Sequence, residues 1–200
     1  KNQLQLEKMA SPRLIKSHYT FIPEYPKVVY MVRDPREVFI SEFFYLKREG
    51  VIDKKVLFDN IFEYLMNGFP PHMARAQYGC WGSHVGGWMG ALGHLNEKMF
   101  IMRYEDLKND PVRSIESLVS FLGRTFPKDD ISRAIESASF SNMKTMDANR
   151  SANKAGKKKE PFVRGVKNDE WQEYFNYHML HEMDRKWGLW TEQFKYDLFS

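Results

Sequence analysis

The stretch KVVYMVRDPREVFIS, residues 27–41, carries the clearest fold signal in the chain. Its first half, residues 27–33, is apolar at almost every position, as is typical of a strand buried in the centre of a parallel sheet. In its second half Asp34 can cap a helix, Pro35 suits the first helical position, and Glu37 stands at the spacing of a capping box. The stretch therefore predicts a strand that passes directly into a helix.

The same strand-to-helix pattern recurs along the chain. Residues 98–104 (KMFIMRY) predict a second strand, and Asp110-Pro111 then begins a helix that Gly123 ends. Residues 13–18 (RLIKSH) predict a further short strand. Alternating strands and helices predict an α/β fold of three layers, with a mainly parallel central sheet flanked by helices. The expected helices cover residues 34–47, 55–67, 83–95, 130–138 and 169–186.

The composition fits one globular domain over residues 1–200, with 42% hydrophobic and 28% charged residues. Residues 148–160 are polar, basic and without periodicity, which predicts a mobile surface loop. A net charge of +4 mildly favours anionic partners. Cys80 is the only cysteine, so no intrachain disulfide can form, which fits a reducing compartment. No apolar run is long enough to span a membrane.

Arg33 is the first candidate for a functional side chain. It stands at the carboxyl end of the expected central strand and directly before a helix, where open α/β sheets bind ligands and where helix amides favour anions. Ser41 follows about two turns later and supplies a hydroxyl. Together they are a candidate phosphate grip. The alternative is a surface arginine paired with Asp34 or Glu37.

His18 and Lys16 form a second candidate pair. Histidine is the usual general base near neutral pH, and residues two apart on a strand point to the same side. A base beside a cation suits the transfer of an anionic group to a hydroxyl. The alternative is a histidine held by structural hydrogen bonds alone.

A third candidate follows the lysine-rich loop. Arg164 and Gly165 come after four lysines within residues 154–159, which resembles a flexible segment that closes on phosphate. The alternative is an ordinary solvated charge run. Tyr104 and Phe140 are either core residues or contacts to a purine. Trp81 and Trp88 are expected to pack.

Six segments, in order, resemble the cytosolic family of sulfotransferases that use 3′-phosphoadenosine 5′-phosphosulfate (PAPS). They are RLIKSH (13–18), YMVRDPREVFIS (30–41), CWGSHVGGW (80–88), RYEDLKNDP (103–111), SFSNMK (139–144) and FVRGVKNDEW (162–171). The resemblance implies the sulfotransferase version of the P-loop nucleoside-kinase-like fold. It also implies transfer of a sulfuryl group from PAPS to an acceptor hydroxyl or amine, with PAP as product and no metal.

The resemblance assigns a role to each candidate by position. His18 would be the general base, with Lys16 steadying the sulfuryl group. The cofactor would be held by Arg33, Ser41, Tyr104, Ser139, Phe140, Arg164 and Gly165. The acceptor, a small molecule, would meet Phe43, Phe44 and Tyr45, and this aromatic run favours a small, partly apolar hydroxyl compound.

The chain departs from the family in ways that keep alternatives open. The family's phosphosulfate loop, K-[ST]-G-T-[TN]-W, is absent from the 200 residues, so the chain is expected to be incomplete at its start and inactive alone. One alternative is a non-catalytic relative that binds phosphoadenosine. Another is a polyanion-binding or nucleic-acid-binding protein, which the 26 acidic residues disfavour. The expected location is the cytoplasm, without membrane or nucleic-acid partners, and a homodimer stays open because the family's dimer motif is not recognisable.

Overall fold

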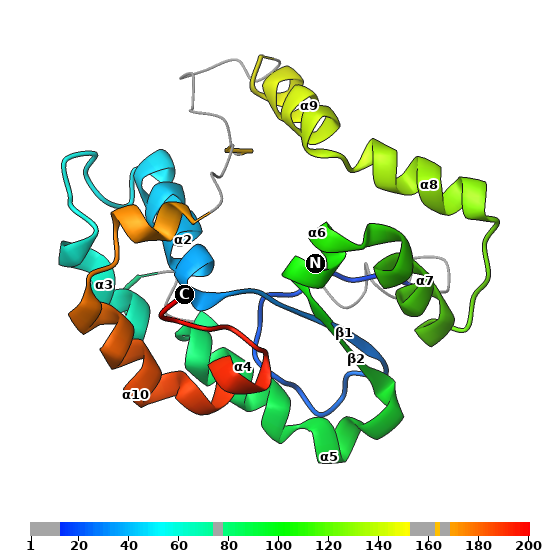
Figure 1. Cartoon of the computed structure of the whole chain (residues 1–200), viewed down its shortest axis with the longest axis horizontal. Helices are drawn as coiled ribbons and strands as arrows, with labels where there is room; N and C mark the ends of the chain where they lie inside the picture. The colour runs from blue at the N-terminus through cyan, green and yellow to red at the C-terminus, as the bar shows by residue number, and fades with distance from the viewer. Residues whose placement is uncertain (1–12, 74–77, 153–162, 165–168) are drawn as a thin grey trace.

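A two-stranded parallel sheet forms the centre of the computed structural model. The structure describes residues 13–73, 78–152, 163–164 and 169–200, and for residues 150–152 it describes the backbone only. The strands are β1 (Val28–Val32) and β2 (Met99–Arg103), paired in register from Val28 with Met99 to Val32 with Arg103. Both predicted strands are confirmed to within a residue at each end. Because the strands are parallel (Figure 1), the residues that follow them, Arg33 and Tyr104, emerge at the same end of the sheet.

The two faces of this sheet differ sharply. On one face Tyr30 and Val32 are buried against helices, and Tyr30 stacks on Trp88 with ring centroids 5.4 Å apart. On the other face Val29 and Met31 stay 40% and 49% exposed, whereas the β2 side of that face is partly covered by α7 (Pro111–Phe121). The main core therefore lies on the Tyr30 side, between β1 and the helices α2 (Pro35–Glu49), α4 (Trp81–Gly90) and α10 (Tyr177–Gln193).

Helix α2 (Pro35–Glu49) begins as its sequence predicts, but with a different partner for its cap. The Asp34 carboxylate accepts from the Arg36 amide at 2.8 Å, and Pro35 takes the first helical position. The expected capping box with Glu37 is wrong. The Asp34 amide donates instead to Glu105 Oε1 at 3.1 Å, because the parallel pairing brings the segment after β2 beside the segment after β1.

Helices α4 (Trp81–Gly90) and α10 (Tyr177–Gln193) lie side by side (Figure 1). They approach each other closely at Gly82. A Cβ built at Gly82 would overlap the buried indole of Trp187. Trp81 and Trp88 are buried in the core, as expected. The contact explains why the residue after Trp81 is a glycine, although glycine is a poor helix former.

We expect Gly82→Ala to lower the free energy of unfolding by about 1–3 kcal/mol, because the new methyl group must displace a packed indole. The measurement is urea unfolding of both proteins. The matched control is Gly87→Ala in the same helix, where a Cβ meets no atom within 4 Å and alanine should be neutral or stabilising. Equal stability of the Gly82 variant and the parent protein would contradict this packing.

Among the remaining helices of the described chain, the end of α7 confirms its glycine signal. Helix α7 ends at Gly123, which has a φ of +68° and donates to Ser120 O, and the next amide donates to Val119 O. The same arrangement at Gly50 ends α2. The other helices are α3 (Asp59–Asn67), α5 (Leu92–Leu95), η2 (Asn96–Lys98), α6 (Tyr104–Asn109), α8 (Lys128–Ser137), α9 (Phe140–Ala152) and η3 (Glu170–Glu173).

Two sequence-based expectations are wrong. Residues 13–18 form no strand: they pair with neither β1 nor β2, and Leu14 and Ile15 are 81% and 60% exposed. Residues 148–152, which were expected in a loop, instead belong to α9, which continues to Ala152. Residues 153–160 of that loop lie outside the described residues. No helix in the described part of the chain is long and apolar enough to cross a membrane.

Candidate functional site

A cleft of about 290 Å³ lies beside the carboxyl end of β1, between α2, α3 and α4. Both His18 and Arg33 line it. His18 is exposed and approaches Tyr78 edge-on, with ring centroids 5.8 Å apart. The structure therefore brings the predicted base and the predicted phosphate-binding arginine to one cavity, although residues 13–18 form no strand.

The walls of this cleft are mostly aromatic and apolar. A flat or apolar molecule would find ring faces and edges on several sides, which is the common character of small-molecule sites. The aromatic members of the lining are Tyr30, Phe39, Tyr64, Phe69, Tyr78 and Trp81. A larger hollow of about 460 Å³ lies between β2, α6 and α7, but no predicted site residue lines it.

Arg33 lies just before the start of α2, where several contacts hold its side chain and its backbone. Its guanidinium pairs with Glu37 at 2.8 Å and lies over the Tyr104 ring, 4.5 Å from the centroid. Its backbone oxygen accepts from Trp81 Nε1 at 2.9 Å. Its Nε is buried and has no hydrogen-bond partner among the described residues. The predicted pairing with Glu37 thus exists, and it leaves a donor of the same guanidinium unused.

Arg164 is oriented in a similar way, beside Phe44 of α2. It makes two hydrogen bonds to Glu170, at 2.6 and 2.8 Å, and lies over the Phe44 ring at 3.6 Å. Burial raises the pKa of Glu37, Arg33 opposes that rise, and the charge of Glu170 adds to it. The charges of Glu37 and Glu170 are therefore close enough to interact. The arginines paired with them, Arg33 and Arg164, border the same region.

Of the other predicted cofactor residues, none that the structure describes lines the cleft. Tyr104 lies under Arg33, and Ser41 is exposed on α2. Phe140 is 51% exposed and neither it nor Ser139 lines the cleft. Both stand where α8 meets α9, on the arm that extends away from the helices of the core (Figure 1). Lys16 is exposed and does not line the cleft, and Gly165 lies outside the described residues.

The expected acceptor residues need a correction. Phe43 is 2% exposed and packs inside the core against Phe44, Phe58 and Tyr174, because it lies on the helix face that also carries Phe39 and Leu46. Phe44 instead supports Arg164. Tyr45 is half-buried, and none of residues 43–45 lines the cleft.

His84 is a cleft residue to which the sequence reading gave no role. Its Nδ1 lies 3.1 Å from the Tyr30 hydroxyl, and its ring stacks on that of Tyr30. Burial lowers the pKa of His84, although hydrogen bonding with the backbone of His18 and Tyr19 opposes the shift. A neutral imidazole thus stands next to His18. The histidine of the CWGSHVGGW segment was the available signal.

The lowered pKa of His84 predicts a change in stability with pH. Below about pH 6.5 the unfolded chain binds the His84 proton more readily than the folded chain, so acid favours unfolding. The stability that neutral His84 contributes is complete above that pH and is lost on acidification. We expect the melting temperature to fall further between about pH 7.5 and 5.5 in the parent protein than in His84→Gln. Parallel melting curves for the two proteins would contradict the assignment.

Among the residues that the structure describes, no group of three or more histidine, cysteine, aspartate or glutamate side chains could hold a metal ion. The polar side chains that line the cleft include the imidazoles of His18 and His84 and the guanidinium of Arg33, together with the Glu42 carboxylate and three tyrosine hydroxyls. The imidazoles can accept a proton and the guanidinium can hold an anion, which are the two tasks in moving a charged group to a hydroxyl.

Comparison with known proteins gives one family match and several relatives. The model of the sulfotransferase domain matches residues 1–195. Human sulfotransferase 2A1 is 32% identical over 146 residues, which cover 70% of this chain and 48% of that protein. A flavonol sulfotransferase-like protein of Flaveria bidentis is 25% identical over 167 residues, covering 80% of this chain and 52% of that protein. The chain thus spans about half the length of these relatives.

Solved structures show the same fold. Mouse sulfotransferase SULT7A1, complexed with PAP, superposes with a TM-score of 0.73 at 22% identity, over 96% of this chain and 69% of that one. Retinol dehydratase, in complex with androsterone and PAP, gives a TM-score of 0.63 at 24% identity, over 80% of this chain and 45% of that one. The α/β class predicted from sequence is confirmed in the form that these proteins share.

Proposed function

Since the chain belongs to the sulfotransferase domain family, we propose that it serves in the transfer of a sulfuryl group from PAPS to a small-molecule acceptor. The observation that carries the proposal is the shared cleft of His18 and Arg33. One residue can take a proton and the other can hold a phosphate, and both face the same cavity. PAP is then the second product of the reaction.

The chemical step needs one proton transfer and one exchange of bonds at sulfur. His18 takes the proton of the acceptor hydroxyl or amine as the acceptor atom forms its bond to sulfur. The bond from sulfur to the bridging oxygen of PAPS breaks, and its electrons stay with the phosphate of PAP. In-line placement and electrostatic support supply most of the acceleration in such transfers, as in phosphoryl transfer. Lys16 is the proposed cation beside the sulfuryl group.

The proposed grip on the 3′-phosphate consists of Arg33 and Arg164, with Ser41 and Gly165 as further contacts. Both arginines are already oriented by a carboxylate and an aromatic ring, so little side-chain freedom remains to be lost on binding. The start of α2 adds its dipole next to Arg33. Tyr104, Ser139 and Phe140 are the proposed contacts to adenosine, and the last two must close towards the cleft from the α8–α9 junction.

His84 and the aromatic walls extend the proposal to the acceptor. A neutral imidazole next to His18 can share a hydrogen bond with the acceptor oxygen without competing as a charged group. The rings of Tyr64, Phe69 and Tyr78 suit a partly apolar acceptor. We place the protein in the cytoplasm, in line with its single cysteine, and we propose that no metal takes part in the transfer.

A transfer assay tests the proposal directly. The full-length gene product is incubated with sulfur-labelled PAPS and a panel of a phenol, a sterol and an aryl amine, and the labelled products are separated. We expect label on at least one acceptor together with release of PAP. PAP binding without any transfer would favour a non-catalytic phosphoadenosine-binding protein, and no binding of PAP would overturn the proposal.

A further inference from the structure

The side chain of Glu105, the second residue of α6, joins two segments of the chain that are far apart in sequence. Its Oε1 accepts from the Asp34 amide at 3.1 Å, and its Oε2 accepts from the Tyr196 hydroxyl at 2.9 Å. Asp34 opens α2, and Tyr196 lies in the tail that follows α10. One carboxylate therefore connects the carboxyl end of β1 to the C-terminal tail.

The peptide group between Arg33 and Asp34 is held at both of its polar atoms. Its oxygen, from Arg33, accepts from Trp81 Nε1 at 2.9 Å, and its N–H, from Asp34, donates to Glu105. Because a peptide group is planar, two bonds on opposite sides fix its rotation. That rotation sets the direction in which the Arg33 side chain leaves the backbone.

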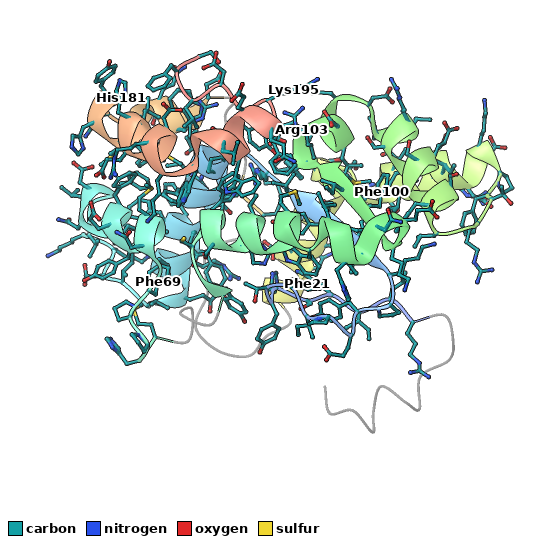
Figure 2. The ribbon with its side chains drawn as sticks, turned by 90° about the horizontal axis from the view of Figure 1, so that it is seen from below. Phe21, Phe69, Phe100, Arg103, His181 and Lys195 are labelled. Atoms are coloured by element: carbon teal, nitrogen blue, oxygen red, sulfur yellow. The ribbon has the colours of Figure 1, made fainter. Side chains whose placement is uncertain are left out.

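The tail is built to direct Tyr196 at Glu105. Lys195 has a φ of +57°, an uncommon conformation for a residue other than glycine, and donates to Glu192 O at 2.9 Å. The Tyr196 amide donates to Thr191 O at 2.8 Å, which completes a tight reversal at the end of α10. The reversal brings the tail back beside Arg103 at the end of β2 (Figure 2), whose guanidinium lies over the Tyr196 ring at 4.9 Å.

The Tyr196 hydroxyl is a permanent donor in this position. The residue is 5% exposed, and burial, followed by the charge of Glu105, raises the pKa of Tyr196 well above its ordinary value. The tail also reaches the start of α2 directly, because Arg36 donates to the Ser200 backbone oxygen at 3.2 Å (Figure 1). Two contacts therefore connect the tail to the turn that carries Arg33.

We propose that Tyr196 is a positioning residue for Arg33, acting through Glu105, so that the C-terminal tail sets the affinity of the phosphate grip. This inference rests on the proposed function of Arg33. Without the hydroxyl, Glu105 loses one of its two donors and the Arg33–Asp34 peptide gains freedom, which PAP binding must then remove. A lost hydrogen bond of ordinary strength corresponds to about a 3- to 10-fold weaker affinity.

Calorimetry with PAP on the full-length gene product tests this inference. We expect Tyr196→Phe to weaken PAP binding about 3- to 10-fold, and Glu105→Gln to weaken it at least as much, since an amide keeps only one acceptor oxygen. In the transfer reaction the KM for PAPS should rise while kcat stays near the parent value. The control is Asn176→Ala, which removes the hydrogen bond from the Met179 amide to the Asn176 side chain at the start of α10 and makes no change at Tyr196 or Glu105. It should lower the melting temperature and leave PAP affinity unchanged.

The outcomes separate this inference from the function on which it rests. Parent-like affinity in Tyr196→Phe overturns the inference, and so does an equal loss in Asn176→Ala, which would show a general effect of stability. Both conclusions require that Arg33→Ala weakens PAP binding in the same experiment. If Arg33→Ala binds PAP as the parent does, the proposed role of Arg33 fails, whatever the tail variants do.

Discussion

Replacing His18 by alanine is expected to lower kcat for sulfate transfer by about 10²- to 10⁴-fold, the usual worth of a positioned general base. The imidazole lines the cleft shared with Arg33, whereas the ion pairs that orient Arg33 and Arg164 are made to Glu37 and Glu170. Affinity for PAP should therefore stay close to that of the parent protein. The measurements are steady-state kinetics on the full-length gene product with PAPS and calorimetry with PAP.

Two other histidines serve as controls for this loss. His181→Ala removes an exposed ring that packs on Tyr177 and Phe199, near the start of α10, and should leave kcat unchanged. His84→Gln removes the second imidazole of the cleft and should cost much less than His18→Ala. If His84→Gln abolishes turnover while His18→Ala keeps it, the general base is His84 and not His18.

Replacing Arg33 by alanine is expected to weaken PAP binding by about 1.5–3 kcal/mol, or about 10- to 150-fold, as measured by calorimetry. This is the range for a hydrogen bond to a charged group, and the guanidinium has a buried Nε that no described residue satisfies. Arg33→Lys should recover only part of the loss, because an ammonium group cannot stack on Tyr104 and pair with Glu37 in the same geometry.

The carboxylate of Glu37 complicates the Arg33 variant and needs its own control. Removing Arg33 leaves Glu37 half-buried without its ion-pair partner, and its negative charge would itself repel a phosphate. The double variant Arg33→Ala/Glu37→Gln removes that repulsion and should still bind PAP weakly. Arg185→Ala, whose side chain is 78% exposed on α10, should bind PAP as the parent does. Strong binding by the double variant would show that Arg33 does not contact the phosphate.

The sequence predicted the centre of the fold because the relevant signals are local. Residues 27–41 contain an apolar run, a capping aspartate and a proline in immediate succession, and each is interpretable without knowing the partner elements. The parallel pairing of β1 and β2 then follows from the helical connection between strands. The meeting of Arg33 and Tyr104 at one edge is a consequence of that pairing.

The errors concern contacts that depend on distant residues. The Asp34 amide donates to Glu105, 71 positions away, and not to Glu37 in the first turn of its own helix. No local sequence rule predicts that partner. Residues 13–18 look like a strand, but they pair with neither β1 nor β2, and no local rule says whether a segment will pair with a strand elsewhere in the chain. Phe43 looked like a pocket residue because aromatic runs occur in pockets, whereas the face of α2 that carries Phe39 and Leu46 takes it into the core.

His84 lies in a segment that the sequence analysis identified, but no function was assigned to its side chain. The CWGSHVGGW segment was identified as part of the family resemblance, yet nothing local says that its histidine reaches the side chain of Tyr30 across the core. The helix α4 heptad places Trp81 and Trp88 inwards, and His84 lies between them on the same face. The packing of α4 on β1 therefore decides that His84 lines the cleft with His18.

A crystal structure of the full-length gene product with PAP tests the central claim most directly. We expect an oxygen of the 3′-phosphate within about 2.7–3.2 Å of an Arg33 guanidinium nitrogen, and the 5′-phosphate directed to the part of the cleft that His18 lines. PAP bound in the hollow between β2, α6 and α7, or in the cleft with its 3′-phosphate turned away from Arg33, would contradict the account.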